Sequence, residues 1–195
     1  MKTTVSKTFQ IGRPIDEVWD FLSDPNKIVT CVPGAKLTEA IDHNRYKGTV
    51  TMKIGPVVTS FNGQIEITRL DKAERIIELS GKGVDTKGKG SANMLLTGKL
   101  VDNGDQTTEV TNNMEISITG KLAQFGSRMI VDVSDLIFEQ FLSNFKNRLQ
   151  AAAENSNEQE APLTNTAKPL NAFSLFFVMI WASILKLFGK APKDS

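Results

Sequence analysis

The sequence predicts an α+β fold in which a curved antiparallel sheet surrounds a long helix. In several segments between residues 45 and 118, apolar and polar residues alternate with the period of strands. Across 121–150, apolar residues recur at steps of three and four, which is typical of an amphipathic helix. The order of these patterns is a third observation, because it runs strand, two short helices, about six strands and one long helix.

The first elements are a strand and two short helices. A strand is expected over about residues 3–11, with its apolar side chains on one face. Pro14 suits the first position of a helix, and residues 15–22 place their apolar side chains on a single helical face. A second short helix is expected to begin at Asp24 and to end near residues 32–34, because Pro33 stops a helix.

The middle of the chain is expected to form the sheet and the end of the domain its cover. Strands are clearest around residues 49–54, 60–67, 92–100 and 110–118, each with one apolar and one polar face. Such strands form an antiparallel sheet that is covered on one side and wet on the other. A helix over 121–150 is on the order of 40 Å long at about 1.5 Å per residue, so it can cross a small sheet. This is the helix-grip arrangement.

The face of the sheet beneath the helix carries an unusual set of side chains. Methionines recur on three strands and on the helix, and methionine adapts to irregular apolar partners. We therefore expect an apolar cavity of the kind that holds small lipophilic molecules. The candidate cavity residues are Met52, Phe61, Gly63, Met94, Leu96, Gly98, Asn112, Met114, Phe125, Met129 and Val133. Ordinary core packing of the methionines is the competing interpretation.

Three of these candidates have two interpretations each. Gly63 and Gly98 either open space for a ligand or, as we favour, let the sheet bend. Asn112 lies between apolar residues on the covered face, and a buried amide needs hydrogen-bond partners. It either binds a ligand carbonyl or, as we favour, lies at a strand end or contacts backbone.

The residues that catalysis or metal binding would need are scarce. His43 is the sole histidine and lies in a polar turn, where it is a poor base and cannot form a histidine-based metal site. Cys31 is the sole cysteine and lies in an apolar context, so we expect a buried structural thiol. No phosphate-binding, dinucleotide-binding or nucleophile-elbow motif is present. We therefore expect no catalytic residues, no metal and no intrinsic cofactor.

Charge and location are constrained by the same sequence. The net charge of +1 offers no basic surplus of the kind that nucleic-acid binding needs. Lys82, Lys87, Lys89 and Lys99 form a mild basic edge, which we interpret as a solvated sheet edge rather than a docking surface for acidic groups. A lone cysteine fits a reducing compartment, and residues 1–7 lack an apolar signal core, so a cytoplasmic location is expected.

The last part of the chain divides into three zones. Residues 151–169 are expected to form a flexible linker, because this polar stretch cannot bury enough apolar surface to fold. Residues 170–188 are almost wholly apolar and form the candidate membrane-anchoring segment, and 189–195 form a basic tail. The candidate anchor residues are Phe173, Phe176, Phe177, Ile180, Trp181, Ile184, Leu185 and Phe188.

The segment 170–188 has three open arrangements. As a helix its uncharged stretch 172–185 spans about 21 Å, whereas a bilayer core is about 30 Å thick. Interfacial anchoring is therefore favoured. Spanning ranks second, because Lys190 and Lys193 would have to cross the membrane. Packing against the chain's own domain or pairing with another subunit ranks third, because a tight dock does not need so long a linker.

Four stretches of the chain together resemble one family. They are VWDFLSDP with CVPG within residues 18–34, KIGP with FNG within 53–63, GKG with GKGSA within 81–92, and TGKLAQFGSR at 119–128. In this order and spacing they resemble the carbon monoxide dehydrogenase CoxG family, a branch of the helix-grip superfamily, which is also called SRPBCC or START-related. The resemblance covers about residues 2–150.

This resemblance implies association with molybdenum hydroxylases, including aerobic CO dehydrogenase. The favoured hypothesis is a non-enzymatic protein, peripheral or C-terminally anchored at the cytoplasmic face of the cell membrane. It would bind a small lipophilic molecule, in the sharper version a quinone, and recruit or service such a hydroxylase. The expected partners are thus the membrane, the hydroxylase and the lipophile. A ligand-free membrane adaptor and a cyclase- or hydratase-like enzyme of the same superfamily are the two alternatives.

Overall fold

The computed structural model describes residues 1–54 and 57–158, and it describes only the backbone at Ile54, Val57, Phe125 and 153–158. Residues Met1–Asn157 form one compact unit. Its elements are β1 (Lys2–Ile11), α1 (Ile15–Leu22), α2 (Pro25–Ile28), β2 (Ala35–Ala40), β3 (Arg45–Ile54), β4 (Val57–Asp71), β5 (Ile76–Asp85), β6 (Ser91–Asp102), β7 (Thr108–Ile118), a 3-10 helix η1 (Gly120–Phe125) and α3 (Gly126–Glu158).

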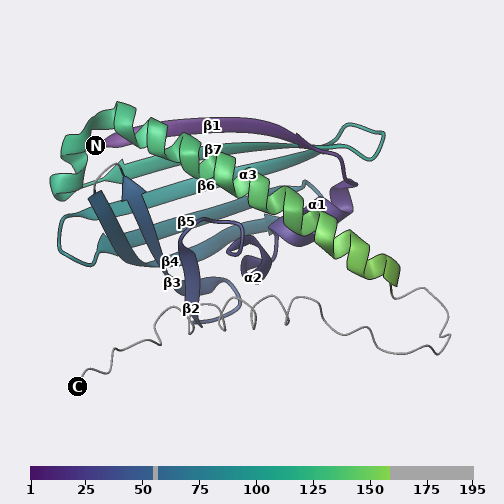
Figure 1. Cartoon of the computed structure of the whole chain (residues 1–195), viewed down its shortest axis with the longest axis horizontal. Helices are drawn as coiled ribbons and strands as arrows, with labels where there is room; N and C mark the ends of the chain where they lie inside the picture. Colours follow the sequence, from purple (N-terminus) through teal and green to yellow (C-terminus); the bar gives the residue numbers. More distant parts are fainter. Residues whose placement is uncertain (55–56, 159–195) are drawn as a thin grey trace, which may run out of the picture. The chain divides into compact units, whose positions relative to one another are not determined.

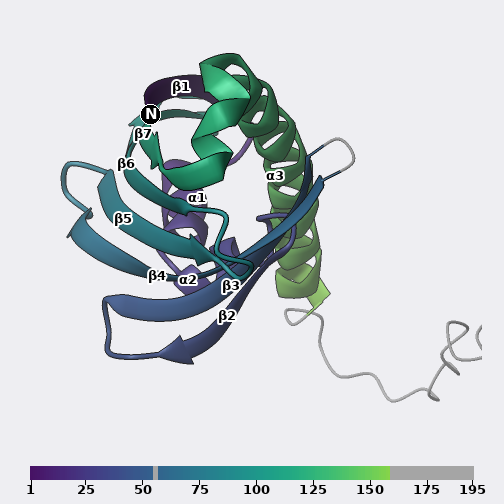
Figure 2. The ribbon, with the colours of Figure 1, turned by 90° about the vertical axis from the view of Figure 1, so that its left-hand side faces the viewer.

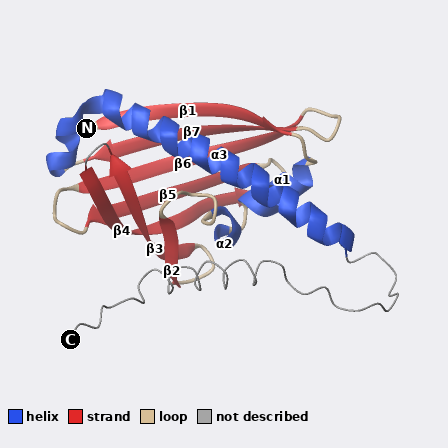
Figure 3. Cartoon of the chain, viewed as in Figure 1, coloured by secondary structure: helices blue, strands red, loops and turns tan. Residues whose placement is uncertain are grey.

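The strands form a single sheet in the order β1-β7-β6-β5-β4-β3-β2, and every neighbouring pair is antiparallel. The first strand thus pairs with the last, while consecutive strands pair from β2 to β7. Figure 1 shows α3 crossing one face of this sheet, with α1 and α2 on the same side, and Figure 3 shows the division into one sheet layer and one helix layer. These findings confirm the α+β helix-grip fold.

A row of glycines crosses three strands where the sheet curls. Gly48 of β3 pairs with Gly63 of β4, which pairs with Gly83 of β5. A Cβ atom on Gly63 would lie 2.5 Å from the carbonyl oxygen of Lys82, and one on Gly48 would lie 2.7 Å from the carbonyl oxygen of Lys36. The strands therefore approach one another here more closely than side chains allow. Figure 2 shows the sheet curling around α3.

The tightly packed core lies at one end of this curl. It brings α1 and the second half of α3 against the neighbouring ends of β1, β6 and β7. Phe145 of α3 is completely buried and packs edge-on against Phe9 and Phe21, with ring centroids 6.4 and 5.1 Å away. The other large core residues are Ile11, Val18, Trp19, Leu22, Ile77, Leu100, Val110 and Leu149.

The boundaries of the helices differ from those that the sequence predicts. The long helix begins at Gly126 rather than at residue 121, because Gly126 has φ +80° and ends η1 before α3 starts. α3 continues past residue 150 to Glu158, since alanines at 151–153 favour helix. α2 ends at Ile28, earlier than expected. The anchor residues and the rest of 159–195 lie outside the described residues.

Candidate functional site

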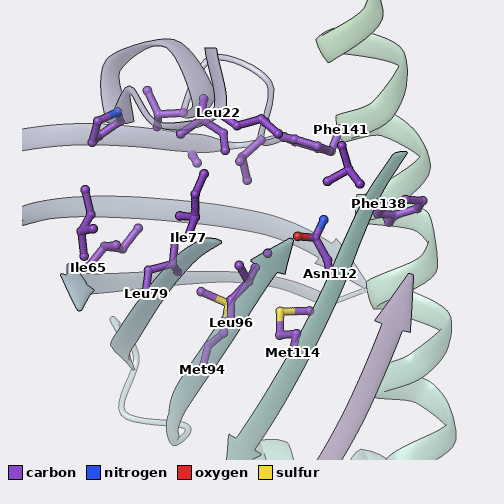
Figure 4. Close-up of a pocket in the computed structure, with 18 of the residues that line it drawn as sticks. Leu22, Ile65, Ile77, Leu79, Met94, Leu96, Asn112, Met114, Phe138 and Phe141 are labelled. Carbon is purple, nitrogen blue, oxygen red and sulfur yellow. The ribbon is translucent and has the colours of Figure 1, made fainter. Parts of the chain in front are cut away.

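An apolar cavity lies where the sheet curls away from the first half of α3. Its first chamber has a volume of about 340 Å³. Strands β5, β6 and β7 supply Leu79, Leu96 and Asn112 to its wall, while α3 supplies Phe138 and Phe141. Figure 4 shows these side chains around an open space, together with Leu22 from α1. The packed core around Phe145 closes off the side of α1, so this space is a part of the interior that the described side chains leave unfilled.

A second chamber of about 380 Å³ lies nearer the start of α3. The glycine row forms part of its wall, since Gly48, Gly63 and Gly83 all line it. Met52 lines it from β3 and Met129 from α3. The curl of the sheet and the missing side chains together create this space.

The two chambers adjoin. They share nine lining residues, which are Val29, Val32, Ala35, Leu37, Ile65, Met94, Met114, Ser134 and Ile137. Seven of these nine are aliphatic or methionine side chains larger than alanine, from β2, β4, β6, β7, α3 and the segment after α2. An elongated hydrocarbon can thus extend from one chamber into the other past flexible methionines.

The structure brings most of the predicted cavity residues together. Leu96, Gly98 and Asn112 line the first chamber, while Met94 and Met114 lie at the boundary of both. The second chamber is lined by Met52, Phe61, Gly63, Met129 and Val133. The side chain of Phe125 lies outside the described part of the structure, so its role stays a prediction. That any of these residues contacts a ligand is likewise still a prediction.

The structure bears differently on the interpretations favoured for Gly63 and for Asn112. Gly63 allows a close approach between strands and also lines the second chamber, so the bend favoured for it stays a prediction. Asn112 lies in the middle of β7, pairs with Lys7 in β1 and Gly98 in β6, and makes no side-chain hydrogen bond within the described residues. The expectation of a strand end or a backbone contact is therefore wrong, and the amide instead extends over Gly98, where a Cβ atom would lie 3.1 Å from Oδ1 of Asn112.

Two other polar side chains of the first chamber are engaged by the protein itself. The Nζ atom of Lys7 lies 2.8 Å from Oδ1 of Asp135 on α3 and 5.8 Å from the ring centroid of Phe138. The hydroxyl of Tyr46 donates to the carbonyl oxygen of His43 at 2.9 Å. These contacts direct both groups toward the protein, which leaves the wall of the chamber almost wholly apolar.

Sequence reasoning missed several lining residues. Ile137, Phe138 and Phe141 lie on the apolar stripe of α3, and the helical period itself could have assigned them to the cavity. Lys7 was missed because a charged residue on an inward position contradicts the pattern of apolar residues on that face. Val29 and Val32 follow α2 in an irregular segment, where no periodicity indicates a direction.

The apolar walls of the two chambers are suited to binding an apolar ligand. Within residues 1–54 and 57–158, no three His, Cys, Asp or Glu side chains gather closely enough to hold a metal ion. Cys31 is fully buried, and burial raises the pKa of its thiol, which keeps it protonated. A hydrocarbon entering the cavity would gain about 25 cal/mol for each Å² of apolar surface removed from water.

A curved antiparallel sheet that holds a long helix over an apolar cavity defines a protein of the helix-grip fold. Residues 8–150 match the family described as the CoxG subunit of carbon monoxide dehydrogenase. The chain therefore belongs to the CoxG family. A search of curated proteins found no sequence match.

Solved structures share the fold. A conserved protein from Geobacillus kaustophilus has a TM-score of 0.70 and 24% identity, over 77% of this chain and 97% of that one. A START superfamily protein from Mycobacterium smegmatis has a TM-score of 0.55 and 15% identity, over 76% and 98% of the two chains. An aromatase/cyclase from Streptomyces has a TM-score of 0.52 and 14% identity, over 79% and 94%.

Proposed function

We propose that this protein binds a lipophilic molecule in its two-chamber cavity and does so at a membrane surface. The observation that carries the proposal is the continuous apolar space between the sheet and α3, which residues 1–54 and 57–158 leave unfilled. Interiors of folded proteins are otherwise close-packed, so two adjoining chambers of this size are costly unless something occupies them. The residues at their boundary are flexible methionines and aliphatic side chains, which suit an elongated hydrocarbon.

We further propose that the ligand is a quinone and that the protein serves a molybdenum hydroxylase of the CO dehydrogenase kind. The CoxG family is described as part of carbon monoxide dehydrogenase, which supports an accessory role. An oxidising hydroxylase must pass electrons to an acceptor, and the acceptor pool of a membrane is lipophilic. The apolar segment 170–188 supports attachment to the cytoplasmic face of that membrane. None of the helices in the described residues is long and apolar enough to cross a bilayer.

The experiment is to isolate the full chain from the membranes of its host in mild detergent and to identify extracted lipophiles by mass spectrometry. We expect a quinone in a ratio approaching one per chain. Val133→Trp would fill the second chamber and should reduce this ratio severalfold, because the indole occupies the space of the ligand. Leu136→Trp is the matched control, since Leu136 is a half-exposed residue of the same helix and does not line either chamber.

A full chain that yields no lipophile, and that takes up no added quinone in a titration, would contradict the binding role. The ligand-free adaptor predicts a different pattern. In that case Val133→Trp would still deliver the hydroxylase to membranes as the unchanged protein does, whereas loss of residues 170–195 would release it.

A further inference from the structure

Asn112 occupies a distinctive place in the first chamber. It lies on the inner face of β7 between Val110, which is 1% exposed, and Met114. Its cross-strand neighbour on β6 is Gly98, and a Cβ atom there would lie 3.1 Å from Oδ1 of Asn112. The glycine therefore leaves room for the amide to project over the sheet. Figure 4 shows the amide directed into the cavity.

The amide of Asn112 has no protein partner in the described part of the chain. A polar group in an apolar wall that lacks a partner costs free energy, so such groups are normally paired. Its other cross-strand neighbour, Lys7, does not supply one, because the ammonium group of Lys7 is held by Asp135 and lies over the ring of Phe138. Asn112 is partly exposed, so solvent can serve its amide in the empty chamber, and a ligand that displaces this solvent must supply the partner instead.

We propose that Asn112 recognises the polar head of the bound lipophile, and that this head carries a carbonyl or hydroxyl oxygen. The inference rests on the proposed binding function and specifies the ligand class. An amide both donates and accepts hydrogen bonds. Its Nδ2 group can donate to a quinone carbonyl, and its Oδ1 atom can accept from the hydroxyl of the reduced quinol. A single residue therefore suits both redox forms of one molecule.

This assignment also orients the ligand. The head lies in the first chamber beside Asn112, and the hydrocarbon chain runs past Met94 and Met114 into the second chamber. The shared methionines are flexible and adapt to chains of different shape. Recognition is thus concentrated at one residue, while the rest of the cavity selects only for apolar character.

The experiment measures dissociation constants of the full chain for decyl benzoquinone, for its reduced quinol and for an alkylbenzene of equal chain length. Asn112→Leu should weaken quinone binding about tenfold, because one buried hydrogen bond is lost, and should leave alkylbenzene binding unchanged or tighter. Asn112→Asp should weaken the quinone more than the quinol, since a carboxylate only accepts hydrogen bonds. Asn113→Leu is the control and should bind all three probes as the unchanged protein does, because Asn113 is an exposed residue of β7 that lines neither chamber.

The outcomes separate this inference from the function on which it rests. If the unchanged protein binds none of the probes, the lipophile-binding function and the role of Asn112 both fail. If it binds the quinone and Asn112→Leu binds it equally well, only the role of Asn112 is overturned. Equal losses for the quinone and the alkylbenzene would also overturn it, because they would indicate a damaged cavity rather than a lost hydrogen bond.

An independent observation concerns the surface around the second chamber. Three exposed cationic residues, Lys53, Lys121 and Arg128, are each adjacent in sequence to a residue that lines this chamber. Those lining residues are Met52, Leu122 and Met129. Figure 2 views the domain from the end that carries η1, the start of α3, the end of β3 and the start of β4.

The cations at this end differ from those at the other end of the strands. Within the described residues, Lys53, Lys121 and Arg128 form no ion pair within 4 Å. At the opposite end, Arg45 lies 2.8 Å from Asp42, and other cationic residues there are similarly paired. Positive charge without an ion pair therefore lies beside the second chamber, and it also occurs at Lys27, Lys146 and Arg148 elsewhere in the described residues. We call Lys53, Lys121 and Arg128 the cationic rim.

We infer that the cationic rim docks on an anionic lipid surface, so that the lipophile passes between the bilayer and the second chamber. Positive charge beside a membrane contributes roughly 1 kcal/mol per residue of attraction to anionic lipid. Exposed apolar side chains at the same end, Val58 at 51% and Met129 at 37%, can enter the headgroup region. A lipid partner fits better than an acidic protein, because the cargo of the proposed function resides in the bilayer.

The experiment follows the rate at which the full chain takes a quinone from vesicles of phosphatidylcholine, with or without one third phosphatidylglycerol. The variant Lys53→Gln/Lys121→Gln/Arg128→Gln should lose most of the acceleration by anionic lipid. The control Lys47→Gln/Lys72→Gln/Lys146→Gln removes the same number of positive charges elsewhere on the domain. This control should retain the acceleration by anionic lipid. Both variants retain the basic tail 189–195, so the tail cannot explain a difference.

Salt should abolish the acceleration, since exposed charges are screened over about 8 Å at physiological ionic strength. Equal acceleration of the rim variant and its control would overturn the docking role of the rim. Absence of quinone uptake from either kind of vesicle, together with absence of binding to decyl benzoquinone in solution, would overturn the lipophile-binding function as well.

Discussion

Asp85 shows how one buried side chain organises a turn of this sheet. It is 3% exposed and accepts a hydrogen bond from the hydroxyl of Thr59 at 2.5 Å. Its other oxygen accepts from the amides of Lys87 and Lys89 in the turn between β5 and β6. These donors, the Thr59 hydroxyl foremost, hold the pKa of Asp85 below its usual range. The ionised carboxylate thus joins β4 to the turn.

Replacing Asp85 by Asn should lower the stability of the domain, because the neutral amide cannot accept from all three donors as a carboxylate does. A depressed pKa stabilises the fold above the unfolded value of about 3.9, and this contribution is lost as pH falls through the folded value. Urea unfolding from pH 7 down to pH 3 should therefore show a difference between the two proteins that shrinks with acidity. A difference that is constant across this range would contradict the assignment.

Single residues were partly predictable from the sequence. The alternation of β7 placed Asn112 on the inner face, because a strand's period alone determines which side a residue faces. Its lack of a partner could not be predicted, since this depends on Gly98 in β6 and on the engagement of Lys7 by α3. Partners that come from distant elements leave no local pattern.

At the scale of elements, α3 combines two different environments. Its second half carries Phe145 and Leu149 into the packed core, whereas Val133 and Ile137 of its first half face the chambers. A regular apolar stripe runs through both halves, so the helical period predicts one continuous buried face. Only the curl of the sheet distinguishes the packed half from the half that borders open space.

Phe145→Ala should therefore cost about 3–5 kcal/mol of unfolding free energy, because it empties a completely buried site among aromatic rings. Met114→Ala should cost much less in the ligand-free protein, since that side chain already borders a cavity. Urea denaturation of the two variants measures both values. Similar costs for the two substitutions would contradict the division of the interior into a packed part and a hollow part.

The glycine row gives a second prediction at this scale. Gly63→Ala should destabilise the domain by roughly 1–3 kcal/mol, because its Cβ would meet the backbone oxygen of Lys82 at 2.5 Å and the strands would have to separate. Gly81→Ala is the control, since its nearest contact is the flexible tip of Met94 at 3.3 Å. Thermal unfolding of the two variants compares them. An equally mild effect at Gly63 would show that the close strand approach is not needed.

At the scale of the whole molecule, an unfilled interior links stability to occupancy. A ligand that binds the folded state alone stabilises it by about 2.7 kcal/mol at a concentration one hundred times its dissociation constant. Decyl benzoquinone should therefore raise the melting temperature of the full chain by several degrees, and Val133→Trp should reduce that shift because it fills the second chamber. Leu136→Trp should show the same shift in melting temperature as the unchanged protein. An unchanged melting temperature at saturating quinone would contradict binding in this cavity.

Much of the overall architecture was predictable from the sequence. Strand periodicity, the amphipathic stripe and the order of elements were enough for the fold class, and the family motifs agree with the match over residues 8–150. The shape of the two chambers could not be predicted, because it depends on the register that aligns Gly48, Gly63 and Gly83 across three strands. The start of α3 was missed because one residue, Gly126, interrupts an otherwise helical pattern.

Among the described residues, the packed core lies only at the α1 end of the domain, so the two halves of α3 should differ in local stability. The half of α3 around Phe145 packs tightly into the core, while the half that starts at Gly126 packs fewer residues into it. The first half should therefore open locally at a lower free-energy cost. The first turns of α3 should hence exchange their amide hydrogens with solvent sooner than the last turns do. We expect that local opening of these turns would admit and release the proposed ligand while the rest of the molecule stays folded.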